Sequence, residues 1–162
     1  MSFHDAAQWL SDTNFSTALR EDPYPYPVLS VIHVFSIALF GGMIALGNLR
    51  VLGYAMRDVP VSQVIDQFRA WKWTGFAILT VTGVFLTLSE PLDLYANAFF
   101  WLSLVLLAAV GLNAWIFHSG IYRRVADWDT AAIAPPPARR WAWWSLFLWI
   151  ALVFAGRLIA FG

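Results

Sequence analysis

The chain has 162 residues, of which 60% are apolar and only 12% are charged, and its ten Lys and Arg residues balance ten Asp and Glu residues. A soluble domain of this length cannot bury so much apolar surface, so the composition indicates a protein of the lipid bilayer. The absence of cysteine excludes disulfides, thiolate metal sites and cysteine nucleophiles.

The first 26 residues are predicted to lie at the outer surface of the membrane. Residues 3–19 place Phe3, Ala7 and Leu10 on one side of a helix, a spacing typical of a short interfacial helix. The sequence REDPYPYP follows, and its three prolines interrupt any continuation of that helix.

Four apolar runs follow, and each is long enough to cross a bilayer as an α-helix, which takes about 20 residues. Every backbone group in lipid needs an internal partner, and the alternation of a β-barrel is absent. We therefore expect an all-α integral membrane four-helix bundle that forms a single domain over residues 1–162. The predicted spans are Pro27–Gly53, Phe68–Leu88, Ala98–His118 and Trp141–Phe161. Before the last span, the sequence APPPARR predicts a stiff polyproline spacer.

Charge is distributed unevenly between the two ends of the predicted bundle. The segment before the first span and the connection between spans two and three are acidic, whereas the other two connections are basic. Because basic short loops stay in the cytoplasm, we expect both termini in the periplasm of a bacterial cell and the protein in its inner membrane. The basic residues are Arg50, Arg57, Arg69, Lys72, Arg123, Arg124, Arg139 and Arg140.

The first span contains His33 in the otherwise apolar sequence VLSVIHVFSIALFGG. At about 100° per residue, His33 shares one stripe with small and polar residues such as Ser36, which is typical of the inside of a membrane bundle. The other spans are likewise predicted to turn glycine-containing faces inward, with Gly83, Gly111 and Gly156.

Ionisable residues inside a membrane are costly, which makes them candidate functional groups. His33 and Arg157 are predicted at a similar depth in the outer half, with His33 about 10 Å from the mid-plane. Imidazole is the usual axial ligand of a b-type haem, and Arg157 suits a haem propionate or a quinone carbonyl. By helix rise, His33 and His118 lie about 20 Å or more apart along the membrane normal, so one haem cannot bridge both.

Several arrangements stay open for these residues. His33 could ligate a haem or metal alone, together with His4 from the N-terminal segment, or across the axis of a homodimer, and His118 is a separate candidate ligand on the inner side. Alternatively, His33 donates to a backbone carbonyl or to Ser36 and only locks helix packing. Arg157 could equally be held against Trp or Tyr rings, or extend outward to the membrane interface.

Seven stretches carry a resemblance to a family of uncharacterised four-helix bacterial inner-membrane proteins, over Ser16–Ala160. They are STALRE, VIHVFSIALFGG, NLRVLG, WKWTGF, GLNAWIFH, VADWD and AGRLIA. The resemblance implies a compact bundle with outward termini and characteristic residues at His33, Arg50, Asn113, His118 and Arg157. The chain has Asn48 and Ser103 where the family more often has aspartate and lysine. The helix-one histidine followed by a glycine pair is also loosely similar to the copper-resistance-D membrane proteins and the cytochrome b561-like bundles.

We therefore expect a small membrane subunit associated with electron transfer, which binds a b-type haem or a quinone near the periplasmic leaflet and serves a larger redox complex. The alternative is a cofactor-free accessory subunit that packs against such a complex and stabilises it. The sequence offers no nucleophile–base pair and no paired carboxylates, so we expect no enzymatic activity of its own. Nothing in it resembles a nucleic-acid site.

Overall fold

Four long helices dominate the computed structural model, which describes residues 3–161 without the side chains of residues 3, 4 and 6. Within that range the regular structure is entirely helical, and each long helix is long and apolar enough to cross a membrane. The predicted all-α architecture of a four-helix membrane protein is therefore confirmed. The long helices are α3 (Pro25–Leu52), α4 (Val61–Ser89), α6 (Ala98–Ser119) and α7 (Pro136–Leu158).

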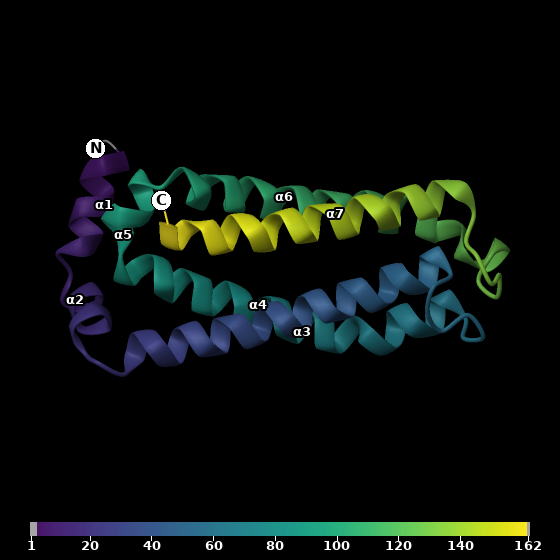
Figure 1. Ribbon diagram of the computed structural model, residues 1–162, viewed down its shortest axis with the longest axis horizontal. Coiled ribbons are helices and arrows are strands. Elements are labelled where there is room, and N and C mark those ends of the chain that lie inside the picture. Colours follow the sequence, from purple (N-terminus) through teal and green to yellow (C-terminus); the bar gives the residue numbers. More distant parts are fainter. Residues whose placement is uncertain (1–2, 162) are drawn as a thin grey trace.

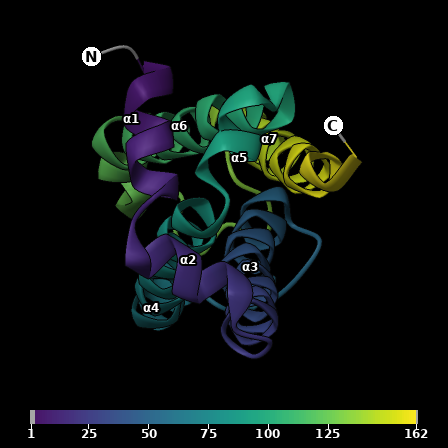
Figure 2. The ribbon, with the colours of Figure 1, turned by 90° about the vertical axis from the view of Figure 1, so that its left-hand side faces the viewer.

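The long helices run side by side along the length of the molecule (Figure 1). Helix α3 packs along α4, α6 packs along α7, and α3 also contacts α7, as the end view in Figure 2 shows. The described chain begins and ends at the same end of the bundle, which we call the terminal end. The short helices α1 (Phe3–Ser11), α2 (Asn14–Glu21) and α5 (Pro91–Ala96) gather there, and η2 (Ile159–Phe161) extends α7.

The opposite end holds the connections 53–60 and 120–135, and the second of these includes the 3-10 helix η1 (Ile121–Asp127). We call it the basic end, because Arg139 and Arg140 at the start of α7 add to the connections, where Arg57, Arg123 and Arg124 lie beside Asp58, Asp127 and Asp129. An apolar cluster closes the bundle at this end, so the two connections are packed against the helices. The buried members of the cluster are Val51, Leu52, Val61, Ala134, Ala138 and Ala142.

The N-terminal segment differs from the single helix predicted over residues 3–19. It forms two helices, α1 and α2, because the Thr13 side chain interrupts the first and starts the second. Thr13 Oγ1 donates to the carbonyl of Leu10 (2.7 Å) and accepts from the backbone N–H of Ser16 (3.2 Å). A threonine that satisfies an otherwise unpaired N–H in this way is a helix N-cap.

Two other helix boundaries were wrongly predicted. Helix α7 begins at Pro136, inside the stretch expected to be a polyproline spacer. Proline is tolerated in the first turn of a helix, where its missing N–H would have no intrahelical partner. Helix α4 begins at Val61 rather than at Phe68, so its first two turns precede the apolar run.

Glycine allows α3 to approach both of its neighbours closely. The indole of Trp149 on α7 occupies the space where a Cβ of Gly41 would lie. On the other side, a Cβ on Gly75 of α4 would lie 3.0 Å from the backbone nitrogen of Phe40. Side chains larger than hydrogen at these positions would separate the helices.

The predicted inward orientation of Gly111 and Gly156 is wrong. Both glycines are exposed, and no atom lies within 4 Å of the position that a Cβ would occupy. Helix α6 turns Val110 and Asn113 inward instead, and α7 turns Ala155 inward. Both helices are apolar around most of their circumference, so the sequence contrast between their faces is small.

Candidate functional site

His33 lies on α3, in the half of the bundle nearer the terminal end, and its half-buried ring packs against α4. Its Nδ1 atom lies 2.8 Å from Oγ1 of Thr82, and its Cε1 atom lies 3.3 Å from the position that a Cβ of Gly83 would occupy. Ser36, one expected partner of the ring, donates from its hydroxyl to the His33 backbone carbonyl instead (2.7 Å). The imidazole is thus held between two helices.

The contacts of the Thr82 hydroxyl favour one of the two neutral tautomers of the His33 ring. Thr82 Oγ1 lies 2.7 Å from the carbonyl of Ile78 and 3.2 Å from that of Leu79. A hydroxyl proton directed at one of these carbonyls leaves Oγ1 to accept from Nδ1–H of His33. In the neutral ring, Nε2 then carries no proton and presents a lone pair.

His118 is not brought near His33. It is exposed at the end of α6 nearer the basic end, and its Nδ1 atom lies 2.9 Å from the carbonyl of Ala114 on the same helix. Its ring packs against Phe117 and Tyr122, at centroid distances of 5.5 and 5.3 Å. The arrangement therefore places the two histidines in opposite halves of the bundle.

Arg157 is exposed near the end of α7, and its guanidinium carbon lies 5.1 Å from the centroid of the Phe161 ring. A ring contact was one of its expected alternatives, but with Trp or Tyr rather than with Phe161. The side chain of His4 lies outside the described residues. Among the side chains that the structure describes, no three potential metal ligands form a group.

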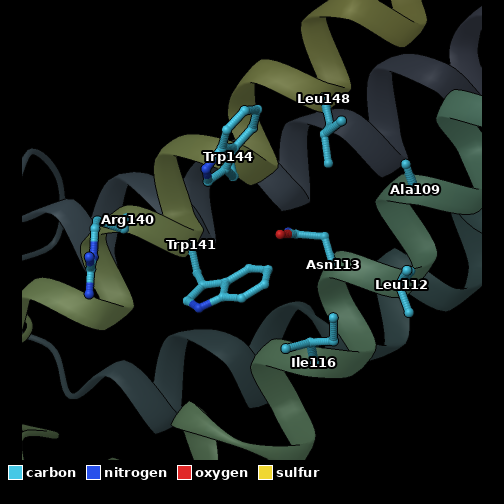
Figure 3. Close-up of a pocket in the computed structure, with 8 residues that line it drawn as sticks. All are labelled: Ala109, Leu112, Asn113, Ile116, Arg140, Trp141, Trp144 and Leu148. Carbon is cyan, nitrogen blue, oxygen red and sulfur yellow. The ribbon is translucent and has the colours of Figure 1, made fainter.

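A pocket of about 460 Å³ lies between α6 and α7, in the half of the bundle nearer the basic end. Figure 3 shows the residues that line it. Its walls come from Ala109, Leu112, Asn113 and Ile116 of α6 and from Arg140, Trp141, Trp144 and Leu148 of α7. The lining is thus largely apolar, with one amide and one guanidinium as its strongly polar groups.

Asn113 is the polar group on the α6 side of the pocket. Its amide points toward α7, with Trp141 and Trp144 on either side of it in the view of Figure 3. The residue is only 7% exposed, yet its side chain makes no hydrogen bond to any residue that the structure describes. An amide without a protein partner that faces a largely apolar pocket is suited to hydrogen-bond a ligand there.

A family model matches residues 26–162, which include all four long helices, and its description is "Family of unknown function (DUF6644)". The chain belongs to the DUF6644 family. The resemblance to an uncharacterised four-helix membrane family is therefore confirmed. No curated protein and no solved structure matches the chain.

Arg50 of this DUF6644 chain holds the two connections of the basic end together. Although it is one of the basic residues expected near the cytoplasmic side, it is 0% exposed. Its Nε donates to the carbonyl of Val59 (2.6 Å), and its Nη2 donates to the carbonyls of Asp129 (3.3 Å) and Ala131 (3.1 Å). Because these carbonyls belong to different connections, we assign Arg50 a structural role.

Asp129 completes the same network. Its carboxylate accepts from the backbone N–H and the hydroxyl of Ser62, each at 2.7 Å. The Ser62 N–H contributes most to lowering the pKa of Asp129 below its ordinary value, and the Ser62 hydroxyl and the Arg50 charge lower it further. The network thus joins the start of α4 to the connection between α6 and α7.

The sequence analysis did not predict Thr82 or Arg140 as residues of candidate sites, and it named Asn113 only as a characteristic residue that the resemblance implies. A usable signal was present for Asn113, because it is an amide within the long apolar run of the third span. Thr82 and Arg140 had no such signal. Threonine is common in apolar helices, and Arg140 lies in a basic segment where any of several arginines could face the helices.

Proposed function

We propose that this protein is a small multi-pass subunit of the bacterial inner membrane that serves electron transfer. His33 contacts a redox cofactor, a b-type haem or a quinone, in the half of the bundle nearer the terminal end. The observation that supports this proposal is the hydrogen bond between His33 and Thr82. Imidazoles that ligate metals are typically held by a hydrogen bond at the second ring nitrogen, which fixes both the tautomer and the ring orientation.

The chemistry of the His33 ring fits either cofactor. An unprotonated Nε2 is the atom that ligates haem iron, and it also accepts a proton from the hydroxyl of a quinol. When bound, either group supplies the electron-transfer chemistry, and the chain supplies binding and orientation. His33 would act alone, or a second ligand would come from His4 or from a second copy of the chain.

The proposal includes an orientation in the membrane. The connections of the basic end carry Arg57, Arg123 and Arg124, whereas the α4–α5–α6 connection carries Glu90 and Asp93. Because basic loops stay in the cytoplasm, the basic end faces the cytoplasm and His33 lies in the periplasmic half. A reporter fused after the last residue tests this orientation. Activity outside the cytoplasm supports it, and activity inside the cytoplasm contradicts it.

A second candidate function is that of a cofactor-free accessory subunit. The same hydrogen bond favours it, because the bond from His33 to Thr82 joins α3 to α4 and could serve helix packing alone. In this role the exposed apolar faces of the helices contact both lipid and a larger membrane complex.

Visible spectroscopy and quinone extraction separate the two functions. Full-length protein is purified in mild detergent from native membranes, in the wild-type form and as the variants His33→Ala and His118→Ala. The exposed His118 serves as the matched control histidine. The proposal expects a Soret band in oxidised and dithionite-reduced samples, or bound quinone in an organic extract. It expects His33→Ala to lose this signal and His118→Ala to keep it.

Two results would overturn the proposal. One is a wild-type protein that is colourless, contains no quinone and co-purifies stoichiometrically with a larger assembly, which supports the accessory role. The other is a His33→Ala variant that keeps the full cofactor content of the wild type, which removes His33 from the site.

A further inference from the structure

The pocket between α6 and α7 lies in the other half of the bundle from His33 and contains none of the residues of the proposed redox site. We infer that this pocket binds an anionic phospholipid, with the phosphate at Arg140 and an ester carbonyl of the lipid at Asn113. The test does not depend on any redox cofactor, but the preference for an anionic lipid rests on the orientation proposed above.

The Asn113 amide supplies the first part of the argument. It lies within the last two turns of α6, is nine-tenths buried, and has no hydrogen-bond partner among the residues that the structure describes. The amide faces the pocket, so a group bound there can satisfy it. The amide nitrogen can donate to an ester carbonyl, a group that every diacyl phospholipid places just below its phosphate.

Arg140 supplies the charge. It lies in the second turn of α7, closer to the basic end than the rest of the pocket, and is exposed. Its guanidinium makes no ion pair or hydrogen bond with any part of the chain that the structure describes. A guanidinium binds phosphate oxygens in a bidentate manner, and its permanent positive charge matches an anion rather than a neutral quinone.

The remaining walls of the pocket suit the apolar part of a lipid. Leu112, Ile116 and Leu148 offer an apolar surface for the start of an acyl chain. The indoles of Trp141 and Trp144 add amphipathic rings to the lining, and such rings are favoured beside lipid headgroups. A volume of about 460 Å³ accommodates the glycerol region and the first part of one chain, and the rest of the lipid stays in the bilayer.

The position of the pocket favours an anionic lipid. It lies near the basic end, where Arg123, Arg124 and Arg139 add positive charge. Basic pockets between transmembrane helices on the cytoplasmic side attract anionic headgroups, and the cytoplasmic leaflet is rich in such lipids.

Native mass spectrometry tests the inference. Full-length wild-type protein in mild detergent is titrated with phosphatidylglycerol and, separately, with phosphatidylcholine of the same acyl chains. The wild type is expected to bind phosphatidylglycerol at least about fivefold more tightly, the contribution of one basic residue at a membrane surface. Equal binding of the two lipids would overturn the inference, as would displacement of phosphatidylglycerol by an equimolar short-chain quinone.

Three variants locate the site. Arg140→Gln is expected to remove most of the preference for phosphatidylglycerol over phosphatidylcholine. Asn113→Leu is expected to weaken the binding of both lipids by about tenfold, which is the contribution of one buried hydrogen bond. Arg139→Gln is the matched control, because Arg139 is exposed and adjacent in sequence but does not line the pocket. The inference fails if Arg139→Gln weakens binding as much as Arg140→Gln, or if folded Asn113→Leu binds both lipids as the wild type does.

Discussion

Nδ1 of the His33 ring on α3 lies 2.8 Å from the Thr82 hydroxyl on α4, and the same hydroxyl lies 2.7 Å from the carbonyl of Ile78 in the preceding turn of α4. The bond therefore has two consequences. It joins two membrane-spanning helices through polar side chains in an apolar environment, and it leaves the second ring nitrogen with a lone pair.

The substitution Thr82→Val tests the hydrogen bond without changing the shape of the side chain, because valine keeps the branched Cβ and lacks only the hydroxyl. We expect Thr82→Val to lower the free energy of unfolding by about 1 kcal/mol, since the Nδ1–H of His33 loses its acceptor. Thermal unfolding in mild detergent measures the effect. Thr82→Ser keeps the hydroxyl and should unfold near the wild-type temperature, and an equal loss in both variants would show that the hydrogen bond is not the cause.

Substitution of Arg50 should destabilise the protein far more than substitution of the other arginines of the basic end. In Arg50→Gln, the shorter side chain cannot reach all three carbonyls, which belong to Val59, Asp129 and Ala131. We expect this variant to lower the free energy of unfolding by about 3 kcal/mol. The exposed Arg123 gives a matched control, for which Arg123→Gln should change the unfolding free energy by less than about 0.5 kcal/mol. Similar unfolding temperatures for the two variants would contradict the structural role of Arg50.

The Asp129 network makes the stability of the basic end dependent on pH. The pKa of Asp129 is lowered by folding, so its stabilising contribution is complete above its ordinary value of 3.8 and is lost as the pH falls through the lower folded value. Asp129→Asn keeps the side-chain size but does not titrate. Wild-type protein should therefore lose more thermal stability than Asp129→Asn between about pH 5 and about pH 2. If the unfolding temperatures of the two proteins fall equally as the pH is lowered, the ionised Asp129 does not contribute to stability as proposed.

Gly41 lies at the α3–α7 contact, and replacing it with any larger residue should destabilise the protein. Gly41→Ala would force the Trp149 indole to move and is expected to cost about 1 to 3 kcal/mol. Gly156→Ala on the open face of α7 should be neutral or slightly stabilising, because alanine favours the helix and meets no atom within 4 Å. Thermal unfolding of the two variants checks both, and a destabilised Gly156→Ala would indicate that this face contacts another chain.

The sequence predicts the membrane spans well, because the length and apolarity of a spanning helix are strong local signals. It does not predict which face of α6 or α7 turns inward. Glycine was assumed to mark the helix contacts, yet Gly111 and Gly156 are exposed while Val110, Asn113 and Ala155 are buried. In lipid, an apolar residue is stable on either face, so periodicity carries little information there.

The candidate site was predictable only in part. The polar character of His33 within an apolar run draws attention to that position, but its partner Thr82 is one of several hydroxyl residues along α4. The role of Arg50 could not be predicted, because its acceptors are backbone carbonyls of connections whose conformation depends on the packed helices. Such long-range contacts leave no spacing pattern in the sequence.

The state of the His33 ring tests the account most directly. Nitrogen-15 NMR of histidine-labelled protein in lipid, assigned by comparison with His33→Ala, reports which ring nitrogen carries the proton. We predict a neutral His33 ring with its proton on Nδ1 and an unprotonated or cofactor-bound Nε2. A neutral ring protonated on Nε2 would place no lone pair there, and it would contradict the proposed role of His33.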